Sequence, residues 1–138
     1  MDIPTLGSVM TRAPRVVDAL QDVRTTDAIM RQHGVRHLPV VKDGKLYGIV
    51  SERDLRGTLA VLGSAPGEVG PPVMAVCARD PLLVGLADPL DAVAARMADA
   101  RVGSALVVDG HVLVGIVTTV DLCRELAKLV RSLRPTSA

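Results

Sequence analysis

Two stretches of the sequence place a hydroxyl and a carboxylate at the same fixed spacing. Residues 48–55 read Gly-Ile-Val-Ser-Glu-Arg-Asp-Leu, and residues 115–122 read Gly-Ile-Val-Thr-Thr-Val-Asp-Leu. One interpretation is a capping box, in which the hydroxyl caps a helix and the acid three residues later reaches back to the free N–H. The other is a ligand site at a strand end, in which the carboxylate accepts both hydroxyls of a ribose and the hydroxyl meets a phosphate near a helix N-terminus. The spacing alone leaves both interpretations open.

These stretches end a longer internal repeat. Residues 23–55 fall on residues 90–122 with a constant shift of 67 positions, and such self-similarity indicates one supersecondary unit used twice. Before this block, Val9-Met10 matches Val73-Met74 with a shift of 64. That difference predicts three extra residues, in a loop, near the start of the second copy.

Each copy predicts the element order β-α-β-β-α. Asp22 and Asp88 are the expected N-terminal caps of the first helix in each copy. Asp-Gly between β-branched runs predicts a hairpin in each copy, at Asp43-Gly44 and Asp109-Gly110, and a further helix should start at Ser51 or Thr118. The expected helices and strands are 24–33, 37–41, 46–50, 91–100, 105–108 and 112–117.

A run rich in Gly and Pro separates the two copies. It predicts a linker at residues 63–72, with the first motif at 1–62, the second motif and its C-terminal helix at 73–133, and a tail at 134–138. In the last helix, apolar residues at helical spacing predict a face buried against the core or a second subunit. These residues are Leu122, Leu126, Leu129, Val130 and Leu133.

Composition argues against several classes of function. The net charge of the 138 residues is +1 and Tyr47 is the only aromatic residue, so we expect neither the field nor the stacking surface of a nucleic-acid binder. No apolar run approaches the ~18 residues that span a membrane, and the N-terminus lacks the features of a signal peptide. The sequence therefore predicts a cytoplasmic protein with no membrane partner.

Motifs for catalysis or metal binding are weak. His33 and His37 imitate a metal-binding pair, but Gly34 should end the helix between them and no third ligand is evident. Cys77 and Cys123 lie far apart and are expected to be buried free thiols. Neither Gly-x-Ser-x-Gly nor Gly-x-x-x-x-Gly-Lys-[Ser/Thr] occurs. We therefore expect no metal site, no required cofactor and no enzyme activity.

Three segments, in order, resemble the CBS motif. They are the opening Val-Met-Thr at residues 9–11, the segment Val-Arg-His-Leu-Pro-Val-Val at 35–41, and the ending Gly-x-Val-Ser-x-x-Asp. The second copy resembles a more diverged member, and the resemblance covers nearly all of residues 9–125. It implies an α/β fold in which two tandem β-α-β-β-α CBS motifs pack with pseudo-twofold symmetry into one Bateman module. Such modules commonly bind AMP, ADP, ATP or S-adenosylmethionine in two clefts between the motifs.

For the first cleft, the resemblance implies that Asp54 binds ribose, whereas Ser51, Arg36 and His37 meet phosphate. Arginine suits this role because it forms charge-assisted, bidentate hydrogen bonds to phosphate. The base is implied to lie against the opposite motif's opening strand. The implied residues are Arg36, His37, Ser51, Arg53, Asp54, Cys77, Val102 and Gly103.

The second cleft is implied to have the same design without the cationic pair. Gly103 and Ser104 stand where the first copy has Arg36 and His37. We therefore predict unequal clefts, the first favouring phosphate-bearing ligands and the second weaker, empty or suited to a less anionic ligand. The implied residues of the second cleft are Thr11, Val16, Val35, Ser104, Thr118 and Asp121.

The leading hypothesis is a non-catalytic, ligand-sensing regulatory module that signals in trans to an unidentified protein partner, since no other domain is encoded on the chain. A ligand would favour one arrangement of the motifs by its difference in affinity for the two states. The alternative is a structural or protein-interaction scaffold with vestigial clefts, in which Asp54 and Asp121 are only helix caps. A nucleic-acid binder acting through Arg124, Lys128 and Arg131 ranks last. A homodimer is also expected, because isolated CBS pairs commonly associate through their helices.

Overall fold

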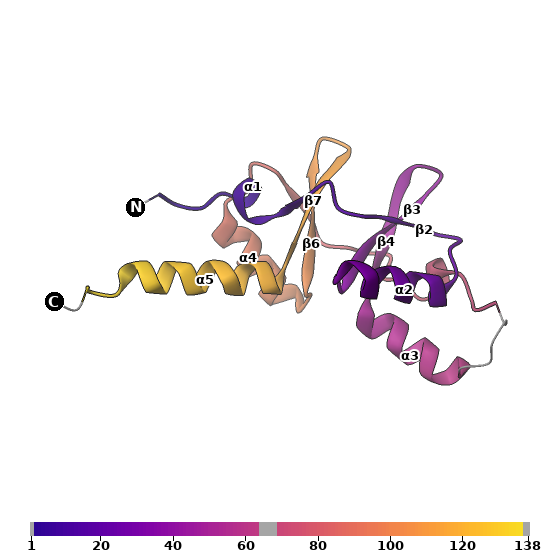
Figure 1. Ribbon diagram of the computed structural model, residues 1–138. Coiled ribbons are helices and arrows are strands. Elements are labelled where there is room, and N and C mark those ends of the chain that lie inside the picture. The colour runs from indigo at the N-terminus through magenta and orange to yellow at the C-terminus, as the bar shows by residue number, and fades with distance from the viewer. Residues whose placement is uncertain (1, 64–68, 137–138) are drawn as a thin grey trace. The chain divides into compact units, whose positions relative to one another are not determined.

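The computed structural model describes residues 2–63 and 69–136, which form two compact units (Figure 1). The central unit comprises residues 14–81, and the terminal unit comprises residues 1–13 together with 82–138. Parts of the predicted linker (64–68) and tail (137–138) lie outside the described residues. Within the described part of the chain, no helix has the length and apolar character needed to cross a membrane.

The central unit is a three-stranded sheet with two helices. Strand β2 runs parallel to β3, and β3 forms an antiparallel hairpin with β4, giving the order β2-β3-β4. Helices α2 and α3 lie together beside this hairpin (Figure 1). The elements are β2 (Val17–Asp18), α2 (Val23–His33), β3 (His37–Lys42), β4 (Lys45–Ser51), α3 (Glu52–Leu62) and the 3-10 helix η1 (Val73–Ala75).

The terminal unit repeats this plan and adds a strand from the N-terminal segment. Its sheet has the order β1-β7-β6-β5, with β1 antiparallel to β7 and β5 parallel to β6. The elements are α1 (Leu6–Val9), β1 (Thr11–Arg12), β5 (Leu83–Gly85), α4 (Leu90–Ala100), β6 (Ser104–Asp109), β7 (Val112–Thr118) and α5 (Thr119–Leu133). The predicted β-α-β-β-α order is confirmed in both units, with helix and strand limits within about one residue of those expected.

Each unit has its own aliphatic core. In the central unit, Leu38, Val40 and Val50 of the hairpin pack against Val23 and Met30 of α2. A corresponding cluster forms in the terminal unit. It contains Leu6, Met10, Val84, Val93, Met97, Ala105, Val107 and Val117.

The opening segment of each motif packs in the unit built by the other motif. Thr11 pairs with Ile116 in the terminal unit, and Ala78 pairs with Ile49 in the central unit. The compact units therefore divide the chain differently from the predicted motifs at 1–62 and 73–133. Those motif limits remain a prediction.

The same pairings correct the predicted length difference between the copies. The Met10 N–H donates to the Leu6 carbonyl (2.9 Å), and the Cys77 N–H donates to the Val73 carbonyl (3.0 Å). Leu6 and Met10 therefore correspond to Val73 and Cys77, and the shift is 67 positions, as in the rest of the repeat. The three extra residues expected near the start of the second copy do not exist. The Val-Met match was misleading because the buried residue that begins each segment is Leu6 in one copy and Val73 in the other.

The helix ends agree with the sequence in part. Asp22 caps α2, since its Oδ1 accepts from the Arg24 N–H at 2.7 Å, and Gly34 ends the helix with φ of 62°. The predicted cap Asp88 is wrong. Pro89 occupies the N-cap of α4, and Asp88 Oδ2 instead accepts from the Gly85 N–H at 2.8 Å. The repeat shift of 67 positions already relates Asp22 to Pro89, which is one residue after the predicted cap Asp88.

The two hairpin turns also differ. Asp43 and Gly44 adopt φ of 52° and 76°, which confirms the first predicted turn. In the second hairpin, Asp109 still pairs with Val112, so the turn is Gly110-His111, one residue later than predicted. Gly110 supplies the positive φ there, at 64°.

The apolar face of α5 is not covered within the unit. Its residue Leu122 packs against the core cluster, but α5 has no buried residue and Leu126 is 61% exposed. Of the two predicted partners for this face, the core is therefore wrong beyond the first turns of the helix, and a second subunit stays a prediction. Both cysteines are free thiols, as predicted, but the prediction that they are buried is wrong. Cys123 is exposed and Cys77 is only half-buried.

Candidate functional site

The first candidate site is built where β4 passes into α3. Ser51 is the N-cap of α3, and its Oγ accepts from the Asp54 N–H at 3.2 Å. In return, the Ser51 N–H donates to Asp54 Oδ2 at 2.9 Å. The capping-box interpretation of the sequence is therefore confirmed here, and it fixes both side chains at the helix N-terminus.

The terminal unit contains the same arrangement between β7 and α5. Thr118 Oγ1 accepts from the Asp121 N–H at 3.4 Å, and the Thr118 N–H donates to Asp121 Oδ2 at 2.8 Å. The Thr118 hydroxyl also donates to Asp121 Oδ2 at 3.1 Å. Both copies thus form a complete capping box.

The capping box occupies only one oxygen of each carboxylate. Asp54 and Asp121 use Oδ2, and their Oδ1 atoms accept no hydrogen bond from residues 2–63 or 69–136. A carboxylate has about four acceptor sites. Capping and ligand binding are therefore compatible at each aspartate.

Arg36 and His37 lie beside the first capping box because of the strand register. His37 begins β3 and pairs with Ser51 at the end of β4. The Glu52 N–H donates to the Arg36 carbonyl at 2.8 Å, which brings Arg36 to the start of α3. The Arg36 side chain is 77% exposed, and its Nε lies 3.6 Å from Glu52 Oε2. The helix N-terminus and a solvated guanidinium thus meet at one place, which favours an anion.

The charge of His37 depends on its surroundings. Burial lowers the pKa of His37 from its ordinary value of 6.5; the Asp54 carboxylate raises it, and the Arg36 guanidinium lowers it further. The net lowering favours a neutral imidazole at pH 7, which offers one donor and one acceptor.

The segment after η1 packs against β4 shortly before the Ser51 turn. The Ile49 and Ala78 backbones exchange two hydrogen bonds, of 2.9 and 2.8 Å. A Cβ at Gly48 would overlap the Ala78 carbonyl oxygen and lie 3.2 Å from Cys77 Sγ, so Gly48 permits this close approach. Burial raises the pKa of the Cys77 thiol, and its Sγ donates to the Met74 carbonyl at 3.7 Å. Cys77 is thus a protonated thiol next to Gly48 of β4.

The structure brings six of the eight residues predicted for the first site into the central unit. Arg53 is exposed in the first turn of α3, and no ion pair involves it among the described residues. Val102 and Gly103 belong to the terminal unit, and their role in this site remains a prediction. The six residues of the central unit are Arg36, His37, Ser51, Arg53, Asp54 and Cys77.

In the second site, Gly103 and Ser104 occupy the positions of Arg36 and His37. Ser104 pairs with Thr118 in the sheet, and the Thr119 N–H donates to the Gly103 carbonyl at 3.0 Å. Thr11 lies in the same unit, in β1. Val16 and Val35 belong to the central unit, so their predicted role remains untested.

Sequence reasoning missed one charged residue of the first site, Glu52. It fills an unspecified position of the repeated pattern, where the second copy has Thr119. Its Oε1 lies 2.7 Å from Arg56 Nη2, while its Oε2 faces Arg36. A signal was available, because an acid next to the N-cap and a cation just before the preceding hairpin must meet once the hairpin closes.

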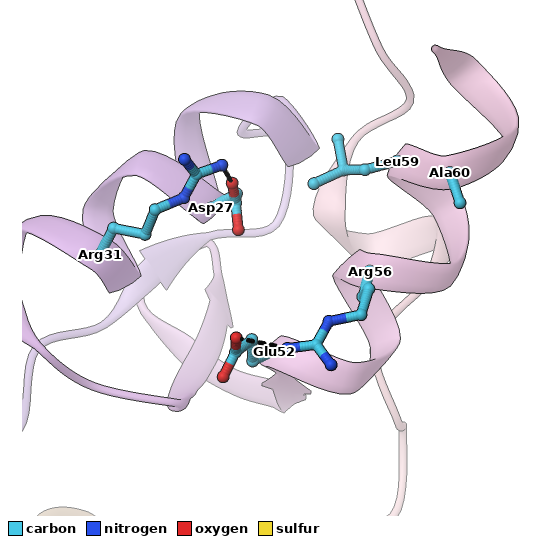
Figure 2. Close-up of a pocket in the computed structure, with 6 residues that line it drawn as sticks. All are labelled: Asp27, Arg31, Glu52, Arg56, Leu59 and Ala60. Atoms are coloured by element: carbon cyan, nitrogen blue, oxygen red, sulfur yellow. Dashed lines mark hydrogen bonds and ion pairs between the residues drawn. The ribbon is translucent and has the colours of Figure 1, made fainter. Parts of the chain in front are cut away.

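Two other features of the units do not add chemistry to the site. A hollow between α2 and α3 is lined by two ion-paired residues from each helix and by the α3 residues Leu59 and Ala60 (Figure 2). Of the Ser51 turn, Glu52 lines this hollow, whereas Ser51, Arg53 and Asp54 do not. No group of three or more His, Cys, Asp or Glu side chains that could hold a metal ion occurs among the residues that the structure describes.

Comparison with known proteins gives consistent matches. The family model described as CBS domain matches residues 6–61 and 73–128. The chain is 31% identical over 119 residues to CBS domain-containing protein YhcV of Bacillus subtilis (strain 168), covering 86% of this chain and 82% of that protein. A stretch of 42 residues is 57% identical to an uncharacterized 17.7 kDa protein of Acidianus ambivalens, covering 28% of this chain and only 26% of that protein.

Solved structures share the fold. The CBS domain pair of protein MJ0100, in complex with 5′-methylthioadenosine and S-adenosyl-L-methionine, has a TM-score of 0.82 at 25% identity, covering 93% of this chain and 99% of that chain. CBSX2 in complex with AMP has a TM-score of 0.75 at 27% identity, covering 92% and 98%. The predicted α/β fold with two tandem CBS motifs, as in a Bateman module, is confirmed.

Proposed function

Because the chain belongs to the CBS domain family, as a pair of CBS domains, we propose that it is a regulatory module that binds an adenosine-containing ligand. The ligand of the central-unit site is an adenine nucleotide such as AMP, ADP or ATP. Asp54 Oδ1 accepts the ribose hydroxyls, while Arg36, Ser51 and the α3 N-terminus bind phosphate. The module has no catalytic role, and a partner protein reads its ligand state.

One observation carries this proposal: the meeting of Arg36, His37, the α3 N-terminus and the free Oδ1 of Asp54 at one strand end. A cation and a helix N-terminus favour a phosphate, and a carboxylate oxygen without a partner favours hydroxyl donors. The relatives in complex with AMP and with S-adenosyl-L-methionine support an adenosine-containing ligand.

The terminal-unit site is proposed to prefer a less anionic ligand, such as S-adenosylmethionine, or to bind nucleotides weakly. Its carboxylate, Asp121, is presented in the same way as Asp54. Gly103 and Thr119 replace the charged residues Arg36 and Glu52, and Ser104 replaces His37. Without a guanidinium, this site loses the strongest phosphate donor of its counterpart.

Calorimetry on ligand-free protein tests the proposal, with AMP, ATP and S-adenosylmethionine as titrants. Asp54→Asn keeps an oxygen for the cap but loses the charged ribose acceptor, so AMP binding should weaken by about 10- to 100-fold, as for hydrogen bonds to charged groups. Asp121→Asn is the matched control and should leave AMP binding at the central-unit site intact. The absence of heat with all three ligands at millimolar concentration would refute the nucleotide-sensing function.

The second candidate is a protein-interaction scaffold with vestigial sites. The specific observation in its favour is that both capping boxes are complete without a ligand. Asp54→Ala separates the two functions. If Asp54 is only a cap, the substitution should cost about 0.5–2 kcal/mol of stability in the ligand-free protein. If Asp54 also accepts the ribose hydroxyls, the substitution should in addition remove the rise in melting temperature that AMP produces.

A homodimer is part of the proposal, with α5 as its contact. The apolar row on α5 is 41% exposed at Leu129, 44% at Val130 and 61% at Leu133. The acids of α5, Asp121 and Glu125, lie toward its start with Arg124 between them, and Lys128 and Arg131 lie toward its end, so two antiparallel copies of α5 are partly complementary in charge. Light scattering should give twice the chain mass at tens of micromolar, and Leu129→Glu should give a monomer. A wild-type monomer at that concentration would exclude the dimer.

A further inference from the structure

Glu52 is shared between the candidate site and the rest of α3. Its Oε2 lies 3.6 Å from Arg36 Nε, and its Oε1 lies 2.7 Å from Nη2 of Arg56, one turn further along the helix. Figure 2 shows the second of these contacts, with Arg56 reaching back along α3 to Glu52. The carboxylate therefore occupies the place where an anion would meet Arg36.

We propose that Glu52 is a specificity-determining residue that competes with the ligand's phosphate for Arg36 and disfavours ligands of high negative charge. The inference rests on the proposed function and adds to it a selectivity among nucleotides. It predicts that Glu52 raises the ratio of monophosphate affinity to triphosphate affinity at the central-unit site. Arg36 and the helix N-terminus by themselves would give a lower ratio.

The competition is physically feasible because the Arg36 contact is weak. The Arg36 side chain is 77% exposed and that of Glu52 is 38% exposed, so the ion pair is solvated and contributes little. A phosphate forms stronger, bidentate hydrogen bonds with a guanidinium. A bound phosphate can therefore displace Glu52 from Arg36, at a cost in affinity.

Arg56 keeps the carboxylate in place after that displacement. The contact between Glu52 and Arg56 joins residues four apart on one helix face, and it is much shorter than the contact with Arg36. Glu52 therefore remains at the first turn of α3, where it offsets the attraction of the helix N-terminus for anions. Its repulsion of the ligand grows with each added phosphate charge.

The terminal unit provides a natural comparison. Thr119 occupies the position of Glu52, and its N–H makes the equivalent bond to the Gly103 carbonyl at 3.0 Å. The backbone of this turn is therefore preserved without the acid. Thr119 shows that the acid is not required for the local fold, and it supplies the substitution Glu52→Thr.

The test is calorimetry of Glu52→Gln and Glu52→Thr with ATP, AMP and adenosine. From the repulsion between charges about 6 Å apart in water and the loss of one surface ion pair, we expect affinity to rise about threefold for AMP and about tenfold for ATP, with adenosine unchanged. Asp27→Asn is the matched control. It removes an acid that lines the same hollow from the neighbouring helix α2, where Asp27 contacts Arg31 and not Arg36, and it should change none of the three affinities.

The double variant Arg36→Met with Glu52→Gln separates competition from simple repulsion. If the two anions compete for Arg36, the gain in AMP affinity from Glu52→Gln should be smaller in the Arg36→Met background, where only the repulsion between Glu52 and the phosphate is relieved. An equal gain in both backgrounds, or equal changes for adenosine and ATP, would overturn the inference while the proposed function stands. If neither the wild type nor the Glu52 variants bind any of the three ligands, both fail together.

Discussion

Replacing Gly48 by alanine tests whether the Ala78 segment forms one side of the central-unit site. An ideal Cβ at Gly48 would overlap the Ala78 carbonyl oxygen and lie 3.2 Å from the Ala78 carbonyl carbon. The obstructing atoms belong to the backbone, and they are held by the two hydrogen bonds between Ile49 and Ala78. The methyl group therefore cannot be accommodated by a change of rotamer, and the segment must move away.

The magnitude follows from what the movement breaks. Opening two backbone hydrogen bonds costs about 1–3 kcal/mol, and strain of the overpacked segment adds about 1–3 kcal/mol. Alanine recovers about 0.4–1 kcal/mol by reducing the freedom of the unfolded chain. We therefore expect Gly48→Ala to lower the free energy of unfolding by roughly 1–5.5 kcal/mol.

The equivalent substitution, Gly115→Ala, is the matched control. A Cβ there would chiefly meet the Met10 side chain, which is flexible, and would lie 3.1 Å from the Thr11 carbonyl oxygen. Methionine can adapt its rotamer, so we expect a loss of only about 1–2 kcal/mol. Urea unfolding of both variants measures the difference. A cost for Gly48→Ala equal to or below that of Gly115→Ala would refute the described position of the Ala78 segment.

Three further predictions concern single residues. Arg101 ends α4 with φ of 55°, so Arg101→Gly should raise the free energy of unfolding by about 1 kcal/mol, measured in urea. Because the folded-state pKa of His37 is lowered, the unfolded chain binds more protons below pH 6.5, so stability should fall as the pH drops from 7 to 5; His37→Gln should reduce this dependence in thermal melts. A bound phosphate should raise the pKa of His37, so AMP affinity should increase on acidification in the wild type more than in His37→Gln.

The sequence predicted the repeated elements well because local chemistry determines them. Asp43-Gly44 takes the positive φ values of a hairpin turn, and Gly34 ends α2 in the left-handed conformation. The predictions failed where a nearby residue or a similar dipeptide could take the predicted structural position. Pro89 replaced Asp88 at the N-cap, and the dipeptide Val73-Met74 imitated Val9-Met10 without sharing its place in the fold.

The exchange of opening segments could not be read from local patterns. Thr11 pairs with Ile116, and Ala78 pairs with Ile49, across long stretches of sequence. Short segments of this kind carry too few residues for a periodicity, and their register is determined by packing within the unit. The resemblance to the CBS motif already implied that Cys77 lies at the first site, and the structure gives the physical reason. Gly48 leaves room for the Cys77–Ala78 backbone, and the Cys77 Sγ then lies against Gly48, three residues before Ser51 in β4.

The choice between cap and ligand site was undecidable from spacing because the cap and the proposed ribose contact use different oxygens of the same carboxylate. Asp54 caps α3 through Oδ2, which fixes the orientation of the side chain and leaves Oδ1 without a partner among the described residues. A cap that orients the carboxylate lowers the entropy lost when a ribose binds. Spacing therefore cannot separate the two roles, since the first prepares the second. The residue that tests this reasoning most directly is Glu52, because only the closed hairpin brings it to Arg36.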